Sequence, residues 1–236
     1  MIERKRRFFS VLIIAAAIAS IAVVSSFHGT TSNHNAQIQS QSAGTNANSA
    51  LNKLEALAIK GRAPKTGYSR SQFSDTWGSA GNCDMRNYIL GRDMTSVITK
   101  SATDCTVESG TLSDPYTGRT IHFTRGASTS TAVEIDHVVA IGDAWQKGAQ
   151  QLSADTRKQL YNDPLELLAV DGPTNVIKSD GDAATWLPPN KAYRCRYVAR
   201  QIAVKIKYSL WVTQAEHDAM QSVLQTCPTQ DLPTTQ

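Results

Sequence analysis

Three ionisable residues inside an apolar run constrain this chain more than any other feature of its 236 residues. The segment VEIDHVV, residues 133–139, has the apolar composition of a buried β-strand. Glu134, Asp136 and His137 lie within it, and a strand rarely buries such side chains unless partners satisfy them. The segment therefore predicts a satisfied polar pocket, a metal site or a catalytic base.

A second apolar run and a helix follow this segment. LELLAV, residues 165–170, predicts another buried strand, and DGPTN, residues 171–175, predicts a turn that opens a helix. The order is strand, strand, helix, with Asp136 and His137 at the end of the first strand and Asn175 at the start of the helix. We therefore expect these three residues to belong to one site.

The residue types at this site suit phosphodiester hydrolysis. Mg²⁺ takes oxygen ligands and often binds through one or two protein groups plus a substrate phosphate; Asp136 and Asn175 supply such oxygens. An imidazole with an ordinary pKa of about 6.5 can deprotonate an attacking water, which is the role we predict for His137. We also predict that Glu134 orients the imidazole and that Lys178 adds positive charge near the phosphate.

This pattern resembles the ββα-metal motif of HNH nucleases. The longer set EIDHVVA, DAW, GA, NDPLELLAV, GPTN, DGDAATWLPP and RC resembles an exported bacterial HNH-type family related to the C-terminal nuclease domain of GmrSD-type restriction enzymes. The resemblance extends over residues 61–227. It implies an α+β fold with a ββα-metal (HNH) core, a general base at His137, metal ligands at Asp136 and Asn175, and DNA as the substrate.

Two positions depart from the HNH pattern. Glu166-Leu167 stands where the second strand usually has Asn-Leu, so Glu166 either braces the site or disturbs its charge. The usual final histidine ligand is absent. Asn175 is the predicted substitute, and Asp180 and Asp182 are rivals, although SDGD is first of all a turn sequence.

The alternation of side chains along a strand makes a geometric demand. In a regular strand Asp136 and His137 point to opposite faces. Both can act on the same phosphate only if the pleat breaks there, so we predict a bulge or a strand end at this pair. Glu134 shares a strand face with Asp136 and is either the orienting acid or a solvated surface acid.

Charge predicts a second feature. The net charge of +4 arises mainly in the first seven residues, and the remainder carries about +1, so attraction to nucleic acid requires local clustering. Residues 183–215 contain six basic residues and no acidic one. We predict that Arg194, Arg196 and Arg200 bind phosphates of a nucleic acid. A solvated helix face is the alternative.

The N-terminal segment predicts export. Residues 1–27 have a basic start, an apolar run and small residues, as in a signal peptide or an uncleaved signal anchor, although the run is short for a spanning helix. Residues 28–50 are polar and uncharged, which predicts a disordered linker. The nuclease domain is predicted to span 51–228, with a tail at 229–236.

The chain has four cysteines, and an even number in an exported protein favours disulfides. Zinc is the weaker alternative because no CxxC pair is present. Of the three possible pairings, Cys83–Cys105 and Cys195–Cys227 keep each bridge local. Cys195 lies near the start of one predicted helix and Cys227 at the end of the next, so a helical hairpin would bring them together.

Helix signals surround the predicted strands. Asn190 is predicted to cap a helix that reaches about Tyr208, and Thr213 with Glu216 forms a TxxE capping box for a last helix. Further helices are predicted at 51–58, 85–91, 140–147 and 154–161, and a further strand at 119–124.

Together these features predict an exported endonuclease of α+β class that is stabilised by disulfides. It is expected to cleave DNA, or RNA, with Mg²⁺ or Mn²⁺, to be secreted or extracellular, and to need no obligate protein partner. Membrane contact is expected only through an uncleaved N-terminal segment. Two alternatives remain: an inactive nuclease fold that binds DNA or another anion, which Glu166 supports, and a hydrolase of another phosphoester.

Overall fold

The computed structural model describes residues 47–234. The predicted signal segment and nearly all of the predicted linker lie outside these residues. The folded part begins slightly before the predicted boundary at residue 51, because Ser49 and Ala50 are buried and the Ser49 hydroxyl accepts a hydrogen bond from the Asn52 amide. The predicted tail also takes part in the fold, since the Gln230 carbonyl accepts a bond from the Ala50 amide.

The described residues form a mixed α+β structure, as predicted. The helices are α1 (Ala50–Leu54), α2 (Met85–Asp93), α3 (Ile141–Gln146), α4 (Ala154–Tyr161), α5 (Gly172–Lys178), α6 (Arg194–Lys207) and α7 (Gln214–Leu224). The strands are β1 (Ser79–Ala80), β2 (Cys83–Asp84), β3 (Met94–Ser101), β4 (Asp104–Ser113), β5 (Thr120–Thr124), β6 (Val133–His137) and β7 (Leu167–Asp171).

Three small antiparallel sheets result from these strands: β1-β2, β3-β4-β5 and β6-β7. The hairpin of β3 and β4 was not predicted. The first predicted helix is also shorter than expected and ends at Leu54. The residues that follow Leu54 do not continue the helix, because residues 58 and 60 form backbone hydrogen bonds with Val212.

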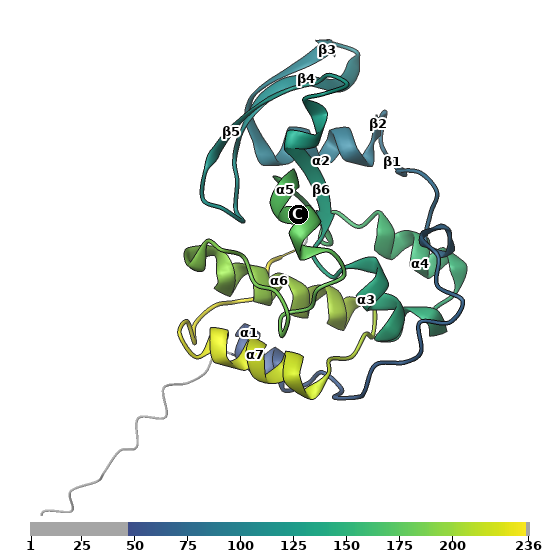
Figure 1. Cartoon of the computed structure of the whole chain (residues 1–236), viewed down its shortest axis with the longest axis vertical. Helices are drawn as coiled ribbons and strands as arrows, with labels where there is room; N and C mark the ends of the chain where they lie inside the picture. The colour runs from purple at the N-terminus through teal and green to yellow at the C-terminus, as the bar shows by residue number, and fades with distance from the viewer. Residues whose placement is uncertain (1–46, 235–236) are drawn as a thin grey trace, which may run out of the picture. The chain divides into compact units, whose positions relative to one another are not determined.

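Strands β6 and β7 lie between two hydrophobic clusters, which explains why both have apolar sequences. Leu167 and Ala169 belong to a cluster formed with α2 and β3-β4-β5. Leu168 and Val170 belong to the other cluster, formed with α1, α3, α4, α6 and α7. Figure 1 shows β6 between these two groups of elements.

Helix α5 follows β7 and packs against both strands, which gives the predicted order of strand, strand and helix. Figure 1 shows α5 beside β6. The Asp171 carboxylate caps the helix by accepting a bond from the Thr174 amide. Gly172 brings the helix start so close to the Thr131 carbonyl that a Cβ atom would collide with that oxygen. The sequence therefore holds α5 directly over the two strands.

Both predicted disulfides, Cys83–Cys105 and Cys195–Cys227, are present. The second disulfide closes the predicted hairpin of α6 and α7.

Asn190 caps a short 3-10 turn (Lys191–Tyr193) that leads into α6. Thr213 caps α7 as predicted, but the Glu216 side chain points into the interior and forms ion pairs there. Within residues 47–234, no helix has the length and apolar composition needed to cross a membrane.

Candidate active site

A pocket of about 210 Å³ opens at the end of β6. Its polar lining includes Arg70, Asp136, His137, Asn175, Ser179 and Asp180. The structure thus brings together the three residues that the strand-strand-helix pattern predicts at one site. The β6–β7 register is regular up to the His137–Leu167 pair, where β6 ends. The strand end, rather than a bulge, therefore lets Asp136 and His137 share one pocket.

Asp136 is buried and held from two sides. Its Oδ1 atom accepts a hydrogen bond of 2.9 Å from the Lys178 ammonium, and its Oδ2 atom accepts one from the Tyr116 hydroxyl. Burial raises the pKa of Asp136, whereas Lys178 and Tyr116 oppose that rise by stabilising the charged form. The carboxylate therefore has a fixed orientation before any ligand binds.

Lys178 lies in the interior, contrary to the prediction that it approaches a phosphate. Its Nζ atom donates to Asp136 Oδ1 at 2.9 Å and to the His137 carbonyl at 2.8 Å. The side chain is buried, so its charge compensates Asp136 instead of facing solvent. Lys178 thus fixes the end of β6.

His137 is buried and uncharged. Its Nε2 atom donates to the Tyr161 carbonyl at 2.9 Å, and its ring stacks on Trp77. Burial, together with the positive charge of Arg70, lowers the pKa of His137 from 6.5 to about 3. Because Nε2 carries the proton, Nδ1 is the basic atom of the ring, and the hydrogen bond of Nε2 is the only one that the ring forms with the described residues.

The Tyr161 carbonyl and the Trp77 ring orient His137, whereas the sequence predicted Glu134 for this role. Tyr161 is the last residue of α4, and its carbonyl is one of those that a helix end leaves without a helical partner. Glu134 does not orient the imidazole. Its Oε2 atom instead accepts a bond of 2.9 Å from Asn175 Nδ2, which leaves the Asn175 Oδ1 atom as the acceptor of that amide.

Glu166 occupies the position where HNH motifs usually have asparagine, and the structure favours its bracing role. Its main-chain carbonyl accepts a bond from the Val138 amide, and its side chain accepts one of 3.2 Å from the Val139 amide. Burial raises the pKa of Glu166 well above its ordinary value. The buried Glu166 side chain therefore supports the main chain just after His137.

The two acidic rivals of Asn175 have different locations. Asp180 lines the pocket, is half exposed and pairs with Lys65 at 2.7 Å. Asp182 is buried and pairs with Lys147 at 2.8 Å and with Arg62 at 2.6 Å. Of the two, Asp180 is therefore the carboxylate that a pocket ligand can reach.

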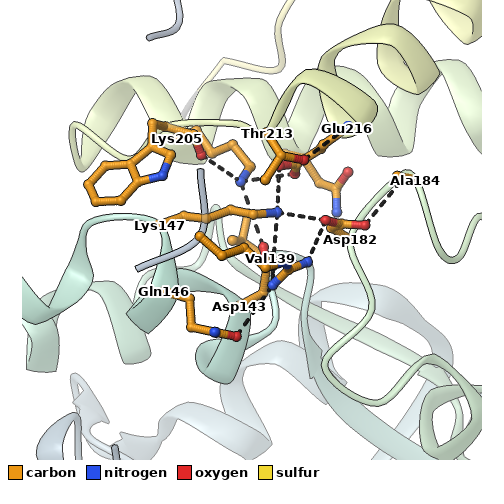
Figure 2. A network of polar contacts seen from close by, with 12 residues as sticks. Val139, Asp143, Gln146, Lys147, Asp182, Ala184, Lys205, Thr213 and Glu216 are labelled. Atoms are coloured by element: carbon orange, nitrogen blue, oxygen red, sulfur yellow. Dashed lines mark hydrogen bonds and ion pairs between the residues drawn. The ribbon is translucent and has the colours of Figure 1, made fainter. Parts of the chain in front are cut away.

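A buried ion-pair network holds the loop that carries Asp180 and Asp182 (Figure 2). Lys147 lies at its centre, with Nζ within 2.8 Å of carboxylate oxygens of Asp143 and Asp182 and 2.6 Å from Glu216. Lys205 pairs with Glu216 at 3.0 Å. Lys205 belongs to the basic run that the sequence suggested for phosphate contact, but it is buried in this network.

The predicted phosphate-binding arginines are also placed elsewhere. The Arg200 guanidinium donates to the carbonyls of Pro164, Leu165 and Leu167, and Arg194 Nε donates to the Pro188 carbonyl. Arg196 lies over the Tyr193 ring. None of these three arginines is among the described residues that line the pocket. They bind main chain or an aromatic ring instead.

Arg70 is the basic residue that the structure adds to the site. It lines the pocket, its guanidinium lies over the Tyr161 ring, and its Nε donates to the Tyr161 hydroxyl at 3.2 Å. The side chain is exposed, so it can approach an anion from solvent. Arg70 stands 66 residues before Asp136 in a stretch without a recognisable pattern, and no sequence signal singles it out.

Sequence comparisons identify the family of the chain. The family model "GmrSD restriction endonucleases, C-terminal domain" matches residues 84–223, which is more than half of the chain and includes every residue that lines the pocket except Arg70. The chain belongs to this GmrSD C-terminal family. An uncharacterized secreted protein of Arthroderma benhamiae is 35% identical over 183 residues, covering 77% of this chain and 86% of that protein. No solved structure matches the chain.

A divalent cation would fit the oxygen donors of this GmrSD C-terminal domain. Asp136 and Asp180 offer carboxylate oxygens, and Asn175 offers an amide oxygen. Residues 47–234 contain no cluster of three or more His, Cys, Asp or Glu side chains arranged to hold a metal ion. Two carboxylates and one amide are fewer groups than a hard cation coordinates, so a bound Mg²⁺ would need water and substrate phosphate as further ligands.

Burial of neutral His137 has a consequence for stability against acid. The folded-state pKa is about 3 and the unfolded value about 6.5, so the contribution of His137 is complete above pH 6.5 and is lost as pH falls toward 3. We expect the free energy of unfolding of the wild type, relative to His137→Gln, to decrease by at most about 1.4 kcal/mol per pH unit in that window. Urea titrations of both proteins in EDTA at pH 7, 6, 5 and 4 measure this difference in the free energy of unfolding. A constant difference would mean that His137 titrates normally.

Proposed function

We propose that this protein is an exported, metal-dependent endonuclease that hydrolyses phosphodiester bonds of DNA, with His137 as the general base. One observation carries the proposal: a single pocket holds an uncharged imidazole, oxygen donors for a hard cation and an exposed arginine. Membership of a family named for restriction endonucleases supports a nuclease. The β6, β7 and α5 elements would form its ββα-metal core.

His137 would start the reaction. Its Nδ1 atom takes a proton from a water molecule while the water oxygen forms a bond to phosphorus. The bond between phosphorus and the leaving oxygen then breaks, and that oxygen takes a proton from solvent. A pKa of about 3 makes free His137 a weak base. The negative charge of a bound phosphodiester offsets Arg70, one cause of the low pKa, and therefore increases the basicity of His137 when substrate is present.

The other pocket residues would hold the substrate and the cation. Asp136 and Asn175 are the proposed ligands of Mg²⁺ or Mn²⁺, with Asp180 beside them. When bound, such an ion stabilises negative charge on the phosphate and the leaving oxygen. Lys178 and Tyr116 keep the Asp136 carboxylate oriented toward this position. Glu166 supports the main chain behind His137.

Arg70 is expected to bind the phosphate directly. Arg70→Gln should lower kcat/KM for DNA cleavage about tenfold and reduce the salt dependence of DNA binding by roughly one phosphate contact. Arg196→Gln provides the matched control, because Arg196 is exposed but outside the pocket lining. Binding titrations over a range of salt concentrations test the prediction. A loss caused by Arg196→Gln and not by Arg70→Gln would instead support phosphate binding by the basic run of α6.

Secretion is proposed from two observations. Two disulfides fit an oxidising compartment, and the Arthroderma benhamiae relative is described as a secreted protein. The chain would then meet nucleic acid outside the cell. DNA is proposed as the substrate from the family alone, and RNA is the second candidate.

Plasmid nicking tests the proposed function. The purified protein is incubated with supercoiled DNA in Mg²⁺, in Mn²⁺ and in EDTA, beside His137→Ala. Nicking that requires metal and disappears in the variant is the expected result. DNA binding without nicking in either metal would point to the inactive binding protein, and cleavage of small phosphodiesters but not of DNA or RNA would point to another phosphoesterase.

A further inference from the structure

Residues 62–70 bring basic side chains to the pocket from outside the part of the chain that the family model matches. The Ala63 amide donates to the Gln146 carbonyl at 2.8 Å, and the Gln146 side chain donates back to the Ala63 carbonyl at 3.1 Å. Arg62 Nη1 pairs with Asp143 of the buried network at 2.7 Å. The segment is therefore fixed on α3, the helix that carries both Asp143 and Gln146.

Lys65 is the residue of this segment that contacts a proposed cation ligand. Its Nζ atom lies 2.7 Å from Asp180 Oδ2 and 4.9 Å from the centre of the Tyr68 ring. The Tyr68 amide donates to the Lys65 carbonyl, and Gly67 supplies the positive φ of 77° that this turn needs. The Lys65 and Asp180 side chains are each about half exposed, so a ligand in the pocket can compete for either of them.

Gly142 allows Asp180 to take this position. A Cβ atom at residue 142 would collide with the Asp180 carboxylate, so the absence of a side chain there lets the carboxylate lie against the main chain of α3. Asp180 also lines the pocket, as Asp136 and Asn175 do. Asp180 is therefore placed within reach of a pocket ligand while Lys65 compensates its charge.

Cations of the chain itself balance the acids around the pocket. Asp136 pairs with Lys178 at 2.9 Å, and Asp180 pairs with Lys65. In the described part of the chain, the charged side chains that line the pocket or hydrogen-bond to side chains of its lining are three acids and three cations: Glu134, Asp136, Asp180, Arg70, Lys65 and Lys178. Their formal charges sum to zero. A divalent cation therefore meets no net negative charge until an anion joins it.

We propose that Lys65 is a positioning residue whose ion pair with Asp180 weakens cation binding in the empty pocket and makes cation binding depend on the substrate phosphate. This inference rests on the proposed function and adds how its cation site is controlled. A phosphate beside Asp180 gives the Lys65 ammonium another partner and so releases the carboxylate to the cation. Because such coupling is reciprocal, the cation should raise the affinity for DNA by the same factor.

Manganese titrations separate this role of Lys65 from catalysis. Electron paramagnetic resonance of free Mn²⁺ measures the Kd for Mn²⁺ without and with a short DNA duplex, in His137→Gln protein so that the duplex stays intact. Without duplex, Lys65→Met should lower this Kd about fivefold, whereas Lys65→Arg keeps the charge and should leave it within about twofold. The duplex should tighten Mn²⁺ binding less when Lys65 is replaced by methionine.

Two further variants test whether Lys65 acts through Asp180. Lys60→Met is the matched control, because Lys60 belongs to the same stretch of chain but lies over the Trp211 ring and does not line the pocket, so the Kd for Mn²⁺ should stay within about twofold. Asp180→Asn should weaken Mn²⁺ binding, and adding Lys65→Met to it should change the Kd no further, since the pair is already broken.

Three outcomes would overturn the inference. Unchanged or weaker Mn²⁺ binding by Lys65→Met would show that the ion pair does not control the cation, while metal-dependent nicking by the wild type would leave the proposed function standing. An equal gain from Lys65→Met in the Asp180→Asn protein would show that Lys65 acts only as a nearby charge. Absence of Mn²⁺ binding by every variant, with and without duplex, would remove the metal dependence of the proposed function and this inference with it.

Discussion

Replacing His137 by glutamine is expected to lower the rate constant of plasmid cleavage by about 10² to 10⁴, the usual contribution of a general base. Glutamine can still donate a hydrogen bond to the Tyr161 carbonyl and stays uncharged, so the site keeps its polar contact but loses the basic Nδ1 atom. Single-turnover cleavage with Mg²⁺ measures the rate, and the far-ultraviolet circular dichroism spectrum checks the fold.

The matched control for this change is His122→Gln. His122 is exposed on β5 and is not among the residues that line the His137 pocket, so the same chemical change there should leave the rate within about twofold. If His137→Gln cut DNA at the wild-type rate, another group would have to activate the water, and the role assigned to His137 would be wrong.

Replacing Lys147 by methionine is expected to destabilise the protein by about 3–5 kcal/mol, as happens when one partner of a buried ion pair is removed. Asp143, Asp182 and Glu216 would lose their shared cation inside the protein. Burial alone would lower the pKa of Lys147, but Asp143 and Glu216 raise it above its ordinary value, so the ammonium is charged at neutral pH. Urea unfolding at pH 7 measures the loss.

Lys207→Met is the control for Lys147→Met. Lys207 also pairs with an aspartate, Asp163, but its side chain is 44% exposed, and such pairs contribute less than about 1 kcal/mol. Asp182 lies two residues from the pocket residue Asp180. We therefore expect Lys147→Met to lower the rate of DNA cleavage by more than the decrease in the fraction of folded protein accounts for. Equal and small effects of the two lysine substitutions would show that the buried network contributes little.

Much of the core around the site could be predicted from the sequence because each signal is local. The apolar runs predicted the two strands β6 and β7, and the segment DGPTN, residues 171–175, predicted the start of the helix that the structure has as α5. Both disulfides followed from spacing and from the two adjacent helices. The gathering of Asp136, His137 and Asn175 in one pocket then follows from the order of these elements.

The electrostatic assignments were less accurate because a linear charge pattern does not show which face of a helix a residue occupies. Lys205 illustrates this: it lies four residues after buried Gln201, on the apolar face of α6, and helical spacing could have indicated its burial. Lys147 likewise lies four residues after Asp143. Arg70 has no such signal, because only the tertiary fold brings it to His137.

The orienting groups of the site could not be predicted for a related reason. The Tyr161 carbonyl and the Trp77 ring hold His137, and Tyr116 holds Asp136. A carbonyl at the end of a helix and two aromatic rings carry no sequence signature of such roles. Glu134 was the predicted orienting acid because it is close to His137 in the sequence. Residues three apart in a strand point to opposite faces, however, and Glu134 accepts a hydrogen bond from Asn175 instead.

The most direct test of the central claim is the fate of the water oxygen. Plasmid DNA is cleaved by the wild-type protein with Mg²⁺ in water enriched in ¹⁸O, and the phosphates at the cut ends are analysed by mass spectrometry. If His137 activates water for attack on phosphorus, each cut should place one ¹⁸O atom in the product phosphate. Cut ends without ¹⁸O, or DNA that is bound but never cut, would contradict the account.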